Sequence, residues 1–143
     1  MKLCDVNIFV YAHRVDAPGH DYYRAWLEEM LAGPRDYFFS ELVLSAFVRV
    51  VTHPRIFRPA SPRAAALAFA EQIRQGTGGT GVMPGSRHWD IFSRLCLRTG
   101  AAGNLIPDAY LAALAIEAQA EWITADADYA AFAPDLRWSL LRP

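Results

Sequence analysis

Five acidic residues occupy positions where a metal ion could be held for hydrolytic chemistry. Each one follows a predicted strand or begins a predicted helix. Carboxylates brought together raise one another's pKa, because like charges disfavour ionisation. A divalent cation offsets that repulsion, and Mg²⁺ or Mn²⁺ takes oxygen ligands of this kind and promotes hydrolysis of phosphodiesters. The sequence therefore predicts metal-assisted phosphodiester hydrolysis by Asp5, Glu41, Asp108, Asp126 and Asp128.

One segment near the C-terminus predicts how the last three of these acids meet. A helix over 109–118 is apolar almost all round, which is typical of a buried helix, and a short strand over 121–124 follows it directly. A helix that leads into a strand of a parallel sheet runs antiparallel to that strand. Asp108 should therefore lie level with Asp126 and Asp128, at the edge where open α/β sheets form their sites.

Each acid also has a simpler structural explanation. Asp5 can cap the helix that follows it, and Asp108 and Glu41 can complement helix dipoles near helix N-termini. Asp126 or Asp128 can cap the next helical turn. These explanations work one at a time, but they do not account for five acids at one edge. The four histidines show no ligand spacing and no partner cysteine, so a zinc site is not expected.

The other elements alternate between strands and helices along the chain. A glycine-rich stretch over 76–81 is predicted to be a flexible loop, and Ser40 fits the N-cap of the helix after the second strand. The alternation predicts an α/β fold with a small central parallel sheet of four to five short strands sandwiched by helices. The predicted strands are 2–6, 37–39, 82–83, 121–124 and 136–141. The predicted helices are 7–12, 20–32, 41–52, 62–75, 86–99 and 109–118. In the helix over 86–99, the side chains predicted to face inward are Trp89, Phe92, Leu95 and Cys96.

Composition limits the classes of protein that are possible. With 143 residues and 53% hydrophobic content, residues 1–143 are expected to form a single domain. The net charge of −1 argues against a surface that grips nucleic acid by bulk charge. Arg49, Arg55 and Arg58 cluster near one loop, either as RNA phosphate contacts or as a solvated helix end. Two distant cysteines and no signal peptide or apolar span predict a reduced cytoplasmic protein away from membranes.

Six motifs in this order resemble the PIN-domain family, and specifically the VapC-type toxin ribonucleases of bacterial toxin–antitoxin pairs. The motifs extend from one end of the chain to the other, and the last three are the most specific. They are Asp5-Val-Asn7, Ser40-Glu-Leu-Val-Leu44, Arg49 to Phe57, Pro107-Asp-Ala109, Leu111-Ala-Ala-Leu-Ala115 and Thr124-Ala-Asp-Ala-Asp-Tyr129.

The resemblance implies a Mg²⁺- or Mn²⁺-dependent endoribonuclease that acts on RNA, forms a homodimer and is silenced by a cognate antitoxin. Carried over by position, it implies metal ligands at Asp5, Asp108 and Asp126 and an auxiliary acid at Asp128. The supporting groups are Asn7, Ser40 and Thr124.

One position departs from the family pattern. The second acid usually lies inside the helix after the second strand, where this chain has Ala46. Glu41 is the nearest acid, but five helical residues separate the two positions by about 140° of rotation. Glu41 is therefore predicted to be an outer ligand that approaches the metal through a water.

Two other functions fit parts of the sequence. The missing acid at Ala46 fits a catalytically silent PIN scaffold that binds RNA or a partner. A haloacid-dehalogenase-like phosphohydrolase also places an aspartate after its first strand, but it needs a second one where this chain has Asn7, and Lys2 is the only lysine. An aromatic-rich N-terminal third predicts a groove for an antitoxin helix and a dimer contact, through Tyr11, Tyr22, Tyr23, Trp26, Tyr37 and Phe38.

Overall fold

A five-stranded parallel sheet forms the centre of the protein. The computed structural model describes residues 1–143. In spatial order the strands are β3, β2, β1, β4 and β5, and every neighbouring pair is parallel. The α/β fold and the small parallel sheet predicted from the sequence are thus confirmed. The strands are β1 (Lys2–Cys4), β2 (Tyr37–Phe39), β3 (Gly79–Gly81), β4 (Glu121–Thr124) and β5 (Trp138–Leu140).

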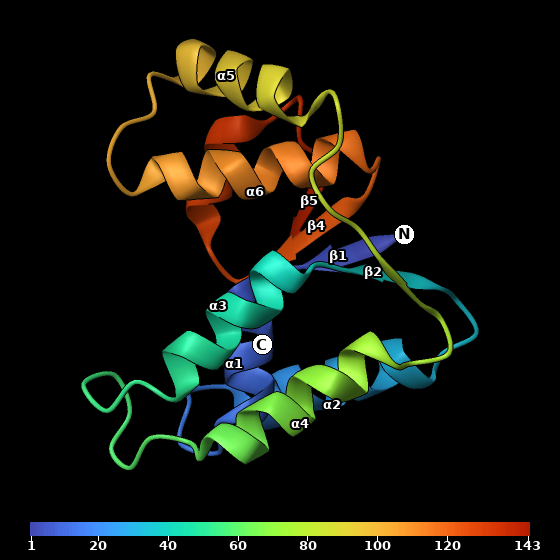
Figure 1. The fold of residues 1–143 in the computed structure, drawn as a ribbon, viewed down its shortest axis with the longest axis vertical. Coiled ribbons are helices and arrows are strands. Elements are labelled where there is room, and N and C mark those ends of the chain that lie inside the picture. The colour runs from blue at the N-terminus through green and yellow to red at the C-terminus, as the bar shows by residue number, and fades with distance from the viewer.

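Helices fill the connections between the strands. Figure 1 shows α5 and α6 packed together near β4 and β5, whereas α1 to α4 gather on the other side of the molecule. This separation follows from right-handed crossovers, because the chain first moves from β1 towards β3 and then returns to β4 and β5. The helices are α1 (Val6–His13), α2 (His20–Ala32), α3 (Glu41–Val51), α4 (Arg63–Arg74), α5 (His88–Thr99) and α6 (Leu105–Glu117), with a 3₁₀ helix, η1 (Ala127–Phe132).

The direction of the chain reverses between β1 and β4. The earlier half of the chain extends the sheet from β1 through β2 to β3, and the later half adds β4 and β5 on the other side of β1. In open parallel sheets, ligands bind outside the carboxyl ends of the strands at such a reversal. The register pairs Cys4 with Ile123, so the residues that follow β1 and β4 emerge side by side.

Helix α6 is buried on nearly all sides, as its composition predicted. Five of its residues are fully buried, and four of them are alanines that allow close packing against neighbours. Its first turn begins at Leu105, so Pro107 and Asp108 both lie in that turn, where the sequence predicted Pro107. The helix leads into β4, which carries the fully buried Trp122. This core fixes the position of Asp108 relative to the end of β4.

The third strand lies three residues earlier than the sequence predicted. Gly79–Gly81 pairs with β2, whereas Val82 and Met83 lie beyond the strand, so the prediction of a flexible glycine loop was wrong there. The reason is packing against aromatic rings. A Cβ atom at Gly79 would lie 2.9 Å from Tyr37 Oη, and one at Gly81 would lie 3.2 Å from the Phe39 ring.

Helix α5 also differs from the prediction. It begins at His88 rather than at residue 86, and its buried side chains are His88, Ile91 and Leu95. Trp89, which was predicted to face inward, is 65% exposed. His88 takes an inward position because its Nε2 bonds the carbonyl oxygen of Tyr110 at 2.9 Å.

No helix in the structure has the length and apolar character needed to cross a membrane.

Candidate active site

Asp5 stands at the point where the chain direction reverses. It follows β1 directly, its backbone N–H donates to Ile123 O of β4, and its side chain is 6% exposed. Oδ1 accepts a 2.7 Å hydrogen bond from Val6 N, so the carboxylate caps α1. Oδ2 accepts a 2.6 Å hydrogen bond from the hydroxyl of Thr124. Asp5 is therefore a helix cap and a member of the acid cluster at once.

Thr124 and Asn7 form a small network around Asp5. Thr124 is fully buried, and its hydroxyl oxygen also accepts hydrogen bonds from Asp126 N at 3.0 Å and from Asn7 Nδ2 at 3.4 Å. The side-chain oxygen of Asn7, Oδ1, in turn accepts a hydrogen bond from Ala125 N at 3.2 Å. These bonds join the start of α1 to the turn after β4. The structure thus brings together two of the three supporting residues predicted from the sequence, Asn7 and Thr124.

Asp108 approaches the same edge from α6. Its Oδ1 accepts a 3.3 Å hydrogen bond from the hydroxyl of Tyr129, a residue of η1. Tyr129 is 1% exposed, and its ring packs against Trp122 and Phe132 in the core. Sequence reasoning missed this tyrosine as a functional residue. The only sequence signal was its place directly after Asp128.

Asp126 and Asp128 differ in their surroundings. Asp126 is the N-cap of η1, and its Oδ1 accepts a 2.9 Å bond from Asp128 N. The predicted cap is therefore present, at Asp126. Asp128 lies in the first turn of η1 with its side chain exposed. Asp126 thus has a second carboxylate oxygen without a protein partner beside the Asp5 network.

The electrostatics show that the acids lie close enough to influence one another. Burial raises the pKa of Asp5 to about 6, and the charges of Asp108 and Asp126 raise it as well, against the lowering effect of the bonds from Thr124 and Val6. Burial also raises the pKa of Asp108, together with the charges of Asp126 and Asp128. The three aspartates that the sequence assigned to the metal are therefore electrostatically coupled.

The donor set fits a hard divalent cation, although the side chains are not already drawn together around one. No group of three His, Cys, Asp or Glu side chains converges closely enough to hold a metal ion as they stand. The coupled carboxylates of Asp5, Asp108 and Asp126 nonetheless repel one another in a partly buried setting. All their donors are oxygens, and a bound cation would offset the repulsion, which is the chemistry that Mg²⁺ and Mn²⁺ prefer.

Glu41 is engaged away from this cluster. It begins α3, and its Oε2 accepts a 3.0 Å bond from Arg74 Nε, at the end of α4. Its side chain is 69% exposed. The charges that raise the pKa of Asp5 come from Asp108 and Asp126. The ion pair with Arg74 counts against Glu41 as an outer ligand, and that assignment stays a prediction.

Ser40 occupies the N-cap position of α3 but does not cap it with its side chain. The hydroxyl is buried and has no hydrogen-bond partner, and the residue is 2% exposed. The prediction of a side-chain cap was therefore wrong. Ser40 follows β2, the neighbour of β1, so it lies at the same edge of the sheet as Asp5.

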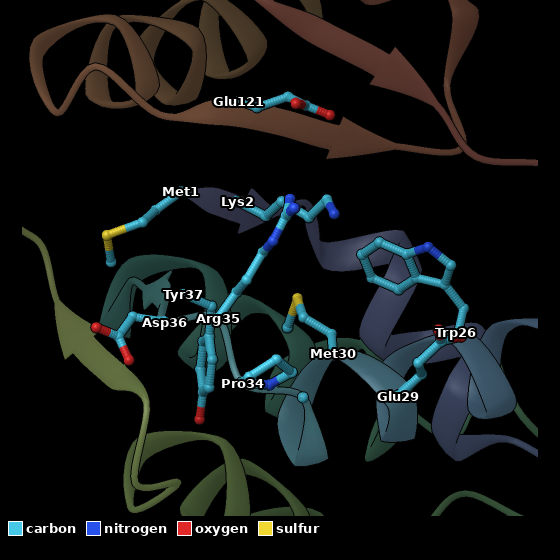
Figure 2. A pocket seen from close by; sticks show the side chains of 11 residues that line it. Met1, Lys2, Trp26, Glu29, Met30, Pro34, Arg35, Asp36, Tyr37 and Glu121 are labelled. Carbon is cyan, nitrogen blue, oxygen red and sulfur yellow. The ribbon is translucent and has the colours of Figure 1, made fainter.

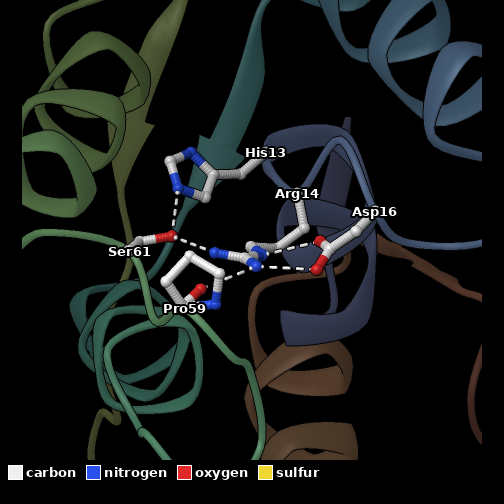
Figure 3. A network of polar contacts seen from close by, with 5 residues as sticks. All are labelled: His13, Arg14, Asp16, Pro59 and Ser61. Atoms are coloured by element: carbon white, nitrogen blue, oxygen red, sulfur yellow. Dashed lines mark hydrogen bonds and ion pairs between the residues drawn. The ribbon is translucent and has the colours of Figure 1, made fainter.

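The arginines predicted to contact RNA lie away from the acids. Helices α1 and α3 both begin at the carboxyl edge of the sheet, and the loop with Arg55 and Arg58 follows the far end of α3. An 11-residue helix is about 16 Å long, which sets the separation. Figure 3 shows how this loop is held: Arg14 donates to Pro59 O, to Ser61 and to Asp16, and His13 Nε2 also bonds Ser61 Oγ. Arg49 is exposed on α3.

A large pocket lies at the opposite edge of the sheet. Its volume is about 670 Å³, and it is lined by residues where β1, β2 and β4 begin. Figure 2 shows Trp26 and Met30 of α2 on one side and Glu121 of β4 across from them. None of the five predicted acids lines it. This pocket is therefore separate from the candidate active site.

The aromatic surface predicted in the N-terminal third is smaller than expected. Tyr23 and Tyr37 are buried, and their hydroxyls donate to Leu141 O and Ile73 O. Tyr22 is 38% exposed, and Trp26 lines the large pocket. Two of the six aromatics thus stabilise the fold rather than forming a surface.

A comparison with protein families identifies the architecture. The model described as "PIN domain" matches residues 2–133. The chain belongs to the PIN-domain family. Membership in this family removes the haloacid-dehalogenase-like alternative.

Similar curated proteins of this family come from mycobacteria. Ribonuclease VapC25 of Mycobacterium tuberculosis is 40% identical over 133 residues, which cover 93% of this chain and 94% of the relative. Ribonuclease VapC43 of the same species is 41% identical over 139 residues, which cover 96% of this chain and 93% of the relative.

Solved structures share the fold at lower sequence identity. Mycobacterium tuberculosis VapC20, described as a sarcin–ricin loop cleaving toxin, superposes with a TM-score of 0.71 at 16% identity, and the whole of both chains is covered. VapBC2 of Rickettsia felis was solved bound to a DNA fragment from its promoter. It superposes with a TM-score of 0.68 at 18% identity, and 96% of each chain is covered.

Proposed function

We propose that this protein is a Mg²⁺- or Mn²⁺-dependent endoribonuclease and the toxin of a toxin–antitoxin pair. The observation that carries the proposal is the placement of Asp5, Asp108 and Asp126 at the edge of the sheet where the chain direction reverses, held by hydrogen bonds from Thr124 and Tyr129. Curated relatives about 40% identical over nearly the whole chain are named VapC ribonucleases, which supports RNA as the substrate.

The three coupled aspartates are the proposed metal ligands. When bound, Mg²⁺ neutralises phosphodiester charge and lowers the pKa of water at the site. Asp5 is held in place through both of its oxygens, by Val6 N and by the Thr124 hydroxyl. Asp108 and Asp126 each accept a hydrogen bond through Oδ1, so each presents a second oxygen. Asp128 is proposed as an auxiliary carboxylate at the exposed rim.

Two groups orient these carboxylates. The Thr124 hydroxyl donates to Asp5 and accepts from Asp126 N, so one side chain sets the positions of two ligands. Tyr129 fixes Asp108 through its hydroxyl. Burial and the nearby acids keep the Tyr129 pKa raised, so this hydroxyl stays protonated and remains a donor. We assign Thr124, Asn7 and Tyr129 positioning roles.

Cleavage of RNA by the purified protein tests the proposal. We expect cleavage with Mg²⁺ or Mn²⁺, loss of cleavage with EDTA, and a folded but inactive Asp108→Asn variant. Asp90→Asn is the matched control, because Asp90 is an exposed acid in the first turn of α5. An Asp108→Asn variant that cleaves at the wild-type rate would refute the metal-nuclease assignment. Binding of RNA without cleavage under any metal would instead support the silent scaffold that Ala46 suggests.

The proposal includes two partners, a second copy of the chain and a cognate antitoxin. The fold shared with the Rickettsia felis VapBC2 structure supports an antitoxin partner. Light scattering at micromolar concentration should report a dimer, and its mass should increase when the product of the neighbouring gene is added. A monomer with no gain in mass would contradict both parts.

A further inference from the structure

A second pocket lies beside the acid cluster, where β2 and β3 end. Its volume is about 560 Å³, within the usual range for sites that hold small ligands. Ser40 lines it from the end of β2, the strand next to β1, and Tyr110 lines it two residues after Asp108 on α6. The pocket therefore lies at the same edge of the sheet as the proposed metal ligands.

The floor of this pocket includes an unsatisfied polar group. Ser40 is among the lining residues and is 2% exposed, and its Oγ is buried without a hydrogen-bond partner. An unpaired buried hydroxyl is unfavourable, so native proteins rarely keep one without a reason. The hydroxyl is therefore a candidate partner for a polar group of a ligand in this pocket.

The rim of the pocket supplies one acceptor and one donor close together. Glu41 Oε2 pairs with Arg74 Nε at 3.0 Å, and Arg74 Nη1 pairs with Glu71 at 2.6 Å. These contacts leave Glu41 Oε1 and Arg74 Nη2 without a partner in the structure. Because the Arg74 charge is already balanced by two carboxylates, the rim does not favour a phosphate.

The walls are apolar and open to solvent. Met83 is 79% exposed and Leu42 is 42% exposed, although both are large hydrophobic side chains. The Tyr110 ring adds an aromatic wall, supported from behind by His88 and Phe92. A flat apolar ligand with a polar edge matches this combination of walls, floor and rim.

We infer that this pocket, the base pocket, holds one nucleobase of the RNA next to the bond that is cut. The inference rests on the proposed ribonuclease function. Each nucleobase has two apolar faces and an edge where a donor and an acceptor are adjacent, which suits the Glu41–Arg74 rim. Single-stranded RNA presents unstacked bases to pockets of this kind, and stacking on aromatic side chains contributes to their binding. Arg74 and Met83 are thus specificity-determining residues.

Sequencing of the ends produced from a random RNA pool tests the base pocket. Wild-type protein should show at least a fivefold preference for one base at one position beside the cut. Arg74→Gln should reduce this preference to less than twofold while the protein still cleaves. Arg63→Gln is the matched control, because it removes the same charge at the exposed first residue of α4. The control should keep the wild-type preference.

Failure of the base pocket and failure of the proposed function give different results. Cleavage with no preference beside the cut, or with the same preference in Arg74→Gln, would overturn the base pocket and leave the ribonuclease intact. No cleavage by the wild type with either metal would refute the proposed function instead.

A binding experiment tests the pocket without turnover. Fluorescence anisotropy of a labelled RNA on Asp108→Asn protein should show about fivefold or greater loss of affinity when the preferred base is replaced by an abasic site. Adding Met83→Ala should weaken binding of the intact RNA. It should also reduce the loss of affinity that the abasic site causes. Equal affinity for the intact and the abasic RNA would contradict the inference. Met83 is well exposed, so Met83→Ala tests the contact with little effect on folding.

Discussion

The hydroxyl of Thr124 donates a 2.6 Å hydrogen bond to Oδ2 of Asp5, across the boundary between the two central strands. The same oxygen accepts a bond from Asp126 N, so a single buried side chain connects two proposed metal ligands. The bond to Asp5 also lowers the pKa of that carboxyl against the effect of burial. Thr124, at the end of β4, therefore sets both the position and the pKa of the Asp5 carboxyl that follows β1.

Thr124→Val should slow cleavage by about 10–100-fold while the protein stays folded, since it removes the hydroxyl that positions Asp5. Without this bond the pKa of Asp5 rises further, so the activity–pH profile should shift to higher pH. Thr124→Ser, which keeps the hydroxyl, should retain most of the activity. The measurement is kcat across pH 5.5–8.5 at saturating Mg²⁺. An unshifted profile in Thr124→Val would show that the bond does not tune Asp5.

The raised pKa of Asp5 predicts a pH-dependent cost to folding. The carboxyl titrates near 3.8 when unperturbed and at about 6 in the folded protein, so the folded state binds its proton more tightly. Stability from this group is therefore greatest at low pH, and it falls as pH rises from about 4 through 6. The full cost is on the order of 3 kcal/mol.

Urea unfolding in EDTA measures this cost as a difference between two proteins. Asp5→Asn should be more stable than the wild type at pH 7.5, and the gap should narrow or reverse at pH 4.5, where the Asp5 proton is retained. Mg²⁺ should stabilise the wild type at pH 7.5 and have little effect on Asp5→Asn. A constant gap across this pH range would contradict the assigned burial of the charge.

Tyr129→Phe should separate support of Asp108 from packing of the core. The ring stays between Trp122 and Phe132, and only the hydroxyl that donates to Asp108 is lost. We expect cleavage to slow by about threefold to tenfold, with a change in the free energy of unfolding of about 1 kcal/mol. Parallel measurements of kcat and urea stability check this. A large loss of stability with unchanged kcat would make Tyr129 a core residue alone.

Glu41→Gln should slow cleavage by less than about threefold, because the structure pairs Glu41 with Arg74 rather than with the aspartates. The sequence analysis predicted an outer ligand, for which the same substitution would cost about 10–100-fold and weaken metal binding. Metal titrations of cleavage distinguish the two outcomes. A raised Mg²⁺ requirement in Glu41→Gln would restore the outer-ligand assignment.

The grouping of the aspartates was predictable because it depends on direction, which sequence reveals well. A helix that leads into a strand of a parallel sheet runs antiparallel to that strand, so the first turn of the helix lies near the strand's carboxyl end. Asp108 therefore had to lie level with the residues after β4, whatever the details of packing. Asp5 and Asp126 followed from the same rule applied to two neighbouring strands.

The features that sequence reasoning missed depend on contacts between distant side chains. Strand β3 has no apolar pattern, and its glycines are explained only by the Tyr37 and Phe39 rings that lie against them. Tyr129 belongs to the core by composition, and its hydroxyl becomes functional only because Asp108 lies opposite. Glu41 pairs with Arg74, which lies 33 positions later in the sequence, and no local pattern indicates this pair.

The insertion of β4 between β1 and β5 has a consequence for the growing polypeptide. A chain whose synthesis stops before Glu121 contains Asp5 and Asp108 but lacks both Thr124 and Asp126. Its first strand then has no neighbour on one side, and its first aspartate has lost one of its two hydrogen-bond donors. The proposed nuclease thus lacks one of its ligands until β4 and the turn after it have been synthesised, so we expect nascent chains shorter than this to leave their own message uncut.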